Sequence, residues 1–361
     1  MAGPPRVVAR ARSAVRAHLA ARLELLADDT GAGHLAPRVL VGVSGGADSL
    51  ALLATTAWVA HRMGLETEAL IIDHALQEDS AAVAGRAAET CRRLGAQAAE
   101  IRRVQVRTDG PGGIENAARA ARQQVFAQRL EETGALALLL GHTLDDQAEQ
   151  VLMGLARGGG PRALAGIPPV RGPVLRPFLG AARDETTALR RADTEEICRL
   201  HDADWWEDPM NADPALLRSR VRGTVLPLLR EQLGEQIDEN LARAAALIGP
   251  DVEHLDAEAR DQLEALRRDG GELREERDLL LLDVHALAAA PGVLRTRILR
   301  DASRLAEAAA GTPSDKSLLR RQVLAADALV VSWHGQAGVP LPGRIEVARR
   351  DGLLVWRRAD P

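Results

Sequence analysis

A short loop of serines and glycines, Ser44-Gly45-Gly46-Ala47-Asp48-Ser49, combines residue types that suit the binding of phosphate groups. It follows a predicted buried strand at residues 39–43 and precedes a predicted helix at 50–63. Two glycines let the backbone turn tightly and point its N–H groups at an anion. The serine hydroxyls add donors, and the positive end of the following helix faces the same point. These features predict a phosphate-binding loop.

Asp48 is the loop residue that a phosphate would repel, so it indicates either a bridging Mg²⁺ or a hydrogen-bonded structural role. A turn rich in helix-capping residues is an alternative explanation of the whole loop. A Walker A loop is not, because that motif places a lysine directly after a glycine. The only lysine of the chain is Lys316, and Asp315 precedes it.

Polar side chains also follow two other predicted strands. Asp73 and His74 come after a strand at 68–72, and the segment 141–150 (Gly-His-Thr-Leu-Asp-Asp-Gln-Ala-Glu-Gln) follows a strand at 136–140. Because ligands gather at the carboxyl ends of parallel strands, we expect these residues to share a crevice with the loop. Taken alone, His74 is equally explained as a structural hydrogen-bonding residue.

Two pairs of charged residues lie three positions apart on predicted helices. Arg119 and Arg122 share one face of a helix at 115–130, and Asp146 and Glu149 share a face just after the strand at 136–140. An ordinary solvated arginine pair remains an alternative for the first. Capping of a helix start remains an alternative for the second, because carboxylates favour that end.

The alternation of strands and helices over residues 38–215 suits crossover connections, which predicts an α/β domain with a parallel sheet covered on both faces. An N-terminal helical extension at 1–37 precedes it, and a mainly helical domain at 216–335 follows it. Gly249-Pro250 is a stop signal inside a helical stretch at 236–266. Asp351-Gly352 predicts a β-hairpin in a short C-terminal segment, 336–361.

The composition, 46% apolar and 27% charged, is typical of soluble globular proteins. Neither an apolar run of eighteen residues nor a signal sequence is present, which predicts a cytoplasmic protein with no membrane partner. Cys91 and Cys198 lie outside any C-x-x-C pair and are expected to be free buried thiols. Zinc proteases and zinc deaminases lack support, so any metal should be a hard cation on carboxylate and phosphate oxygens.

The net charge of −5 weakens the case for a nucleic-acid partner, but the charge is unevenly distributed. Two stretches, 154–180 and 216–230, hold four arginines each and no acid. Such basic islands can hold a phosphodiester backbone. Their members are Arg157, Arg162, Arg171 and Arg176 in the first, and Arg218, Arg220, Arg222 and Arg230 in the second.

The loop resembles that of the N-type ATP pyrophosphatases, and the order of motifs resembles the tRNA(Ile)-lysidine synthetase family. S-G-G-x-D-S is followed by D-H-x-L, by E-x-x-A-R-x-x-R at 115–122 and by G-H-x-x-D-D-Q-A-E at 141–149. Segments at 155–158, 164–167, 207–211, 218–222 and 240–243 continue the likeness, which covers roughly residues 38 to 250. Gln77, Gln123 and Ser219 depart from the family pattern.

The resemblance implies a parallel-sheet ATP pyrophosphatase fold of the adenine nucleotide alpha hydrolase type, and an ATP-dependent ligase that forms a C–N bond. The implied reaction adenylates the C2 carbonyl oxygen of the wobble cytidine in the isoleucine tRNA with a CAU anticodon. The amine of L-lysine then displaces AMP to give lysidine. ATP and Mg²⁺ are the implied cofactors, with Mg²⁺ near Asp48.

The resemblance also implies roles for individual residues. Arg119 would neutralise phosphate or nucleotide charge, and Asp146 and Glu149 would hold lysine. The loop would bind the departing pyrophosphate, and the second arginine island would contact tRNA. The residues concerned are Ser44, Gly45, Gly46, Ala47, Asp48 and Ser49 in the loop, and Arg218, Arg220 and Arg222 in the island.

Two other functions and the oligomeric state remain open from the residues alone. A tRNA 2-thiolating enzyme with the same fold would need suitably placed cysteines, and Cys91 and Cys198 are poorly disposed for this. A catalytically silent tRNA-binding protein is the other alternative, which the intact motifs disfavour. A homodimer is one of the oligomeric states that the sequence leaves open.

Overall fold

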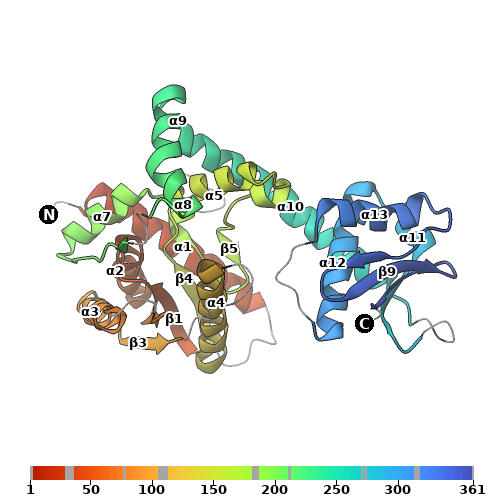
Figure 1. Ribbon diagram of the computed structural model, residues 1–361. Helices are drawn as coiled ribbons and strands as arrows, with labels where there is room; N and C mark the ends of the chain where they lie inside the picture. The colour runs from red at the N-terminus through yellow and green to blue at the C-terminus, as the bar shows by residue number, and fades with distance from the viewer. Residues whose placement is uncertain are drawn as a thin grey trace. The chain divides into compact units, whose positions relative to one another are not determined.

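The computed structural model describes residues 3–28, 36–75, 79–104, 113–180, 187–209, 213–269, 271, 275–312 and 318–359. Gln77, Lys316, and Met210-Asn211 of the family motifs lie outside these residues. The chain divides into two compact units, Met1–Gly249 and Pro250–Pro361, each with its own apolar core (Figure 1). The arginines at 218–222 therefore belong with the loop in the first unit, whereas the sequence placed a boundary near residue 215.

The first unit contains a six-stranded sheet in the order β3-β2-β1-β4-β6-β5. Its first five strands in that order are parallel, as the sequence predicts, and the short edge strand β5 is antiparallel to β6. The strands are β1 (Ala36–Val43), β2 (Glu66–Asp73), β3 (Ala98–Arg103), β4 (Ala135–Leu140), β5 (Val170–Arg171) and β6 (Val174–Leu175).

Strand β1 shows how the two faces of this sheet are built. Val39, Val41 and Val43 point to one core, and Leu40 between them points to the other, because side chains alternate along a strand. The first face packs against α1 (Arg6–Asp28), α2 (Ala47–Arg62) and α3 (Ser80–Arg93), and the second against α4 (Gly113–Thr133) (Figure 1). Helix α7 (Arg191–Leu200) packs on α2 and α1. The predicted N-terminal extension is thus α1, packed on the sheet.

The chain after β4 surrounds the carboxyl edge of the sheet with short helices. They are α5 (Leu144–Ala156), α6 (Pro161–Leu164), η1 (Pro177–Leu179), α8 (Leu217–Arg220), the π-helical turn η4 (Val221–Val225) and α9 (Leu226–Leu233). Val221 and Leu226 pack against Ala148 and Met153 of α5 in a small apolar cluster. This packing fixes the second arginine island beside the segment that carries Asp146 and Glu149.

Helix α10 (Ile237–Leu266) continues through Pro250, so the stop signal at Gly249-Pro250 does not end it. A proline removes one backbone hydrogen bond and crowds the preceding turn, yet its φ is itself close to the helical value. Apolar side chains on either side, Ala245 and Val252, are buried. We attribute the continued helix to this burial, which outweighs the local penalty.

The second unit contains an antiparallel sheet in the order β7-β10-β9-β8. Its strands are β7 (Asp278–Asp283), β8 (Val339–Leu341), β9 (Ile345–Arg350) and β10 (Leu353–Arg358), packed with α11 (Val284–Ala289), α12 (Gly292–Ala310) and α13 (Arg320–Val331). The predicted hairpin is confirmed, with positive φ at Asp351 and Gly352. It is not a separate tail, because β7 and β8 extend it on both sides.

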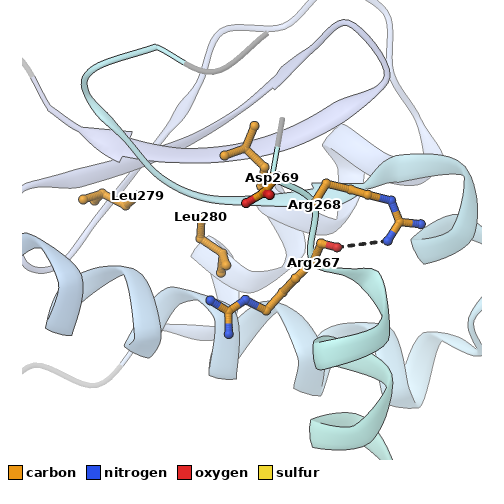
Figure 2. A pocket seen from close by; sticks show the side chains of 6 residues that line it. Arg267, Arg268, Asp269, Leu279 and Leu280 are labelled. Atoms are coloured by element: carbon orange, nitrogen blue, oxygen red, sulfur yellow. Dashed lines mark hydrogen bonds between the residues drawn. The ribbon is translucent and has the colours of Figure 1, made fainter. Parts of the chain in front are cut away.

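A pocket of about 360 Å³ lies in the second unit between the end of α10 and β7 (Figure 2). It is lined by Arg267, Arg268, Asp269 and Leu279, Leu280 and Leu281. Arg267 pairs with Glu264 and Arg268 with Asp283, so both guanidinium groups already have carboxylate partners. All residues for which the sequence predicts chemistry lie in the first unit. Within the described residues, no helix is long and apolar enough to cross a membrane.

Candidate active site

The predicted phosphate loop connects β1 to α2, as expected. Gly45 has φ of +87°, which favours glycine. The Ser44 N–H donates to Ser49 Oγ at 3.2 Å, and Ser49 Oγ donates to the Gly46 carbonyl at 2.9 Å. No side chain caps the start of α2, so its first N–H groups remain available to an anion. The loop therefore has the geometry of a phosphate cradle.

Residues around the end of α7 support the loop from a distant part of the sequence. The Trp206 N–H donates to the Gly45 carbonyl at 3.0 Å, and the Cys198 thiol donates to the Ala47 carbonyl at 3.4 Å. Cys198 and Cys91 are free buried thiols, as predicted. Burial raises the pKa of each thiol to about 12, so both stay protonated at neutral pH.

Gly141, at the end of β4, brings the segment 141–150 against the loop. A Cβ at this position would lie 2.7 Å from the backbone oxygen of Asp48. Only glycine permits this close approach of the two backbones. The segment after β4 and the loop after β1 therefore lie side by side at the carboxyl edge of the sheet.

Asp48 is mostly buried and has two partners on α7. The Thr194 hydroxyl donates to Asp48 Oδ1 at 2.5 Å, and Arg191 Nε lies 3.7 Å from Asp48 Oδ2. Burial, together with the negative charge of Asp146, raises the pKa of Asp48 to about 6 even though Arg191 and Thr194 oppose this. The carboxylate is therefore only partly compensated by the protein.

Asp146 both caps α5 and takes part in a charge network. Its Oδ2 accepts from the Thr143 N–H at 2.8 Å and from the Thr143 hydroxyl at 3.0 Å, which is the capping role the sequence left open. Its Oδ1 accepts from Arg218 Nη2 at 2.8 Å. Burial opposes ionisation, but Arg218 and Arg191 hold the pKa of Asp146 below its ordinary value.

Glu149 has no exposed side-chain surface and is held by two arginines. Arg218 Nε donates to its Oε2 at 2.7 Å, and Arg222 Nε donates to its Oε1 at 2.6 Å. A fully buried carboxylate is stable only with such partners. Glu149 therefore does not cap a helix, and the structure joins it to two residues that the sequence assigned to tRNA.

Arg191 is the site residue that the sequence analysis missed. Its Nη2 lies 3.5 Å from Asp146 and 3.8 Å from Glu149, and its backbone N–H donates to Asp145 at 2.9 Å. One guanidinium therefore connects the loop carboxylate to the acidic pair on α5. One feature of the sequence could have indicated Arg191: it lies at the start of a helix, where a positive side chain is unfavourable unless acidic residues face it.

The remaining predicted residues lie apart from this network. Arg220 points its Nη1 at the carbonyls of Pro214 and Ala215, at 2.8 and 2.9 Å. Arg119 is exposed on α4, and no ion pair involves it within the described residues. The structure therefore brings Arg218 and Arg222 to the carboxylates, but not Arg220 or Arg119.

Comparisons with known proteins agree on one family. Residues 16–229 match the family model of the PP-loop domain. A tRNA(Ile)-lysidine synthase of Leifsonia xyli subsp. xyli is 43% identical over 354 residues, which cover 95% of this chain and 99% of that protein. Another, of Thermobifida fusca, is 42% identical over 355 residues, which cover 98% and 99%.

A solved structure of a U34-tRNA thiolase from Methanococcus maripaludis is a distant neighbour, with a TM-score of 0.49 and 16% identity over 67% of this chain and 80% of that one. A likeness this weak carries no weight beside relatives that match along the full length. The loop, its carboxylates and these relatives agree: the chain belongs to the tRNA(Ile)-lysidine synthase family.

Proposed function

We propose that the chain ligates L-lysine to C2 of the wobble cytidine of the isoleucine tRNA with a CAU anticodon. ATP activates the base, and AMP and pyrophosphate are released. The observation that supports this best is the link through Arg191 between Asp48 of the phosphate loop and the acidic pair on α5. A site that both activates a base and binds an amine needs these two parts side by side. The proposal places the enzyme in the cytoplasm with its tRNA.

The loop serves the first step, in which the C2 oxygen attacks the α-phosphorus and pyrophosphate leaves. In this proposal the uncapped N–H groups of α2 and the hydroxyl of Ser44 would donate to the charge that develops on pyrophosphate. Ser49 would hold the loop in shape, because its hydroxyl donates to the Gly46 carbonyl. Loss of one such donor typically costs ~3 kcal/mol, so Ser44→Ala should slow turnover by about a hundredfold. Arg119 would neutralise phosphate or nucleotide charge beside this site, on the side of α4.

The acidic pair serves the second step, in which the amine of lysine displaces AMP from C2. An ammonium group needs a fixed negative partner, and Asp146 and Glu149 supply two carboxylates. In the structure Arg218 and Arg222 hold these carboxylates, so an incoming ammonium must share or replace them. The same arginines are proposed to contact tRNA, which connects the two substrates at this point.

Asp48 is the residue of the loop that fits Mg²⁺. The ion is commonly held by one or two carboxylates together with phosphate oxygens of the substrate. Asp48 supplies a hard oxygen donor whose raised pKa reflects a charge that Arg191 compensates only in part. When bound there, Mg²⁺ would offset the negative charge of the phosphates.

Labelled lysine tests this function directly. The enzyme is incubated with ATP and the isoleucine CAU transcript, and label retained on RNA is counted. We expect label on this transcript and none on a control transcript with uridine at the wobble position. Asp48→Ala should abolish AMP release while tRNA retention stays nearly intact. Labelling that proceeds without ATP, or no labelling of the CAU transcript, would exclude the proposal.

A further inference from the structure

Four arginines and two histidines gather at the carboxyl edge of the sheet on the side of α4, where His142 borders the carboxylate network through Asp146. We name this group the α4-side basic cluster; it consists of Arg119, Arg122, Arg171, Arg176, His74 and His142. Its placement follows from the strands, because His74 and Arg176 come directly after β2 and β6, and His142 comes two residues after β4. Strands β2 and β4 flank β1 and its loop, and β6 lies beside β4.

Arg122 reaches the same edge from α4. A Cβ at Gly42 of β1 would lie 3.0 Å from Cζ of Phe126, so Phe126 packs against the end of this strand. Arg122 lies one helical turn before Phe126 and therefore on the same face of α4. Its guanidinium is thus directed over the carboxyl edge of the sheet, beside the residues that follow β2 and β4.

The arginines of the cluster have no carboxylate partner within the part of the chain that the structure describes, whereas its histidines interact with Asp73 and Asp146. Among the described residues, Arg119, Arg122 and Arg171 have no hydrogen bond or ion pair, and Arg176 donates only to the Pro168 carbonyl, at 2.8 Å. Arg176 Nε and Nδ1 of both histidines are buried without a partner. Buried polar atoms without a hydrogen-bond partner are costly and rare in folded proteins, so each needs an explanation.

The arginines of the cluster also repel one another. Burial, then the charges of Arg171, Arg119 and Arg122, lowers the pKa of Arg176 to about 10. Burial, then Arg119 and Arg218, lowers the pKa of Arg122. The arginines of the carboxylate network behave oppositely, since Asp146 and Glu149 raise the pKa of Arg218 against the effect of burial. An anion in the cluster would relieve this repulsion.

We propose that the α4-side basic cluster binds phosphodiester groups of the tRNA next to the wobble nucleotide, while the loop binds the phosphates of ATP. This assignment rests on the proposed function. The loop and the uncapped start of α2 already provide hydrogen-bond donors for the phosphates of ATP. The cluster instead runs from exposed Arg119 and Arg171 to partly buried Arg122 and Arg176, an arrangement that suits a chain of phosphates better than one compact group.

Salt-dependent tRNA binding tests the proposal. Arg122→Gln and Arg176→Gln are compared with wild type, and Arg199→Gln, which removes an exposed arginine paired with Glu195, is the control. Filter binding of the isoleucine transcript is measured at several salt concentrations, and ATP binding by calorimetry. Each cluster variant should raise the Kd for tRNA about tenfold and reduce the log–log salt slope by about 0.7 to 0.9. The Kd for ATP should stay within about twofold.

Two results would overturn this assignment. An unchanged salt slope would show that the cluster does not touch tRNA, and a weakened ATP affinity with intact tRNA binding would assign it to the nucleotide. The melting temperature gives a third check. Arg122→Gln removes the repulsion between Arg122 and the neighbouring arginines, so the melting temperature should stay the same or rise. A clear loss of melting temperature would indicate a structural role. Wild-type enzyme that binds tRNA with this slope but transfers no lysine would exclude only the proposed function.

Discussion

At the residue scale, the charges around Glu149 decide what a substitution there does. Arg218 and Arg222 both donate to this fully buried carboxylate. Removing one member of a buried pair strands the other charge, which typically costs ~3–5 kcal/mol. The neighbouring Asp146 retains Arg218 and reduces the penalty. Stability alone therefore cannot distinguish a lysine-binding role from a structural one.

Glu149→Gln should raise the KM for lysine by roughly tenfold or more, because the ammonium loses a charged partner. The KM for ATP should change little, since the loop does not contact Glu149. Steady-state kinetics with each substrate varied in turn measures both values on the same variant. A normal KM for lysine, accompanied only by weaker resistance to urea, would remove Glu149 from the lysine site.

The raised pKa of Asp48 predicts a pH-dependent stability. Its folded value of about 6 exceeds the ordinary 3.8, so the folded chain binds this proton more tightly than the unfolded chain. The carboxylate therefore destabilises the fold increasingly as pH rises from about 4 to 6. Asp48→Asn should be more stable than wild type by about 2–3 kcal/mol at pH 8 and no more stable near pH 3.5. Urea titrations in EDTA at both pH values check this, and an equal difference at both would refute it.

At the element scale, the sequence predicted most of what positions the site. The strands at 39–43, 68–72 and 136–140 are present and slightly longer than predicted, because continuous apolar runs specify buried strands well. The segment β7 was missed, since a short run of leucines fits a buried helix equally well. Arg191 was not predicted as a site residue for another reason. Its contacts with Asp146 and Glu149 form only on folding, and the spacing of residues in the sequence does not encode them.

Gly141 shows how one element places another. An alanine here would press its Cβ against the backbone of Asp48 and push β4 away from the start of α2. We expect Gly141→Ala to cost about 1–3 kcal/mol and to reduce lysine incorporation at least tenfold. Gly85→Ala is the matched control, because open space surrounds Gly85 in α3 and alanine there should stabilise by about 0.5–1 kcal/mol. Equal activity of the two variants would contradict the positioning role.

At the scale of the whole molecule, each unit has its own core. Leu299, Ile298 and Trp356 are fully buried in the second, and the Trp356 indole donates to Ser303 at 3.0 Å. Leu299→Ala should cost about 2–5 kcal/mol, and only in the transition of that unit. Calorimetric scans should then show one transition shifted and one retained, with ATP affinity unchanged. A shift of both transitions by the same amount would mean that the units unfold together.

The thiol of Cys198 donates to the Ala47 carbonyl of the phosphate loop. Its reaction with an alkylating agent can therefore report on opening of the loop. A thiol with a pKa of about 12 and almost no exposed surface reacts with alkylating agents only when its surroundings open. Cys91 has the same pKa but lies on α3, so it serves as an internal reference. Mass spectrometry of tryptic peptides would follow both rates. ATP should slow alkylation of Cys198 more than that of Cys91. The ratio of the two rates would then measure how often the site opens.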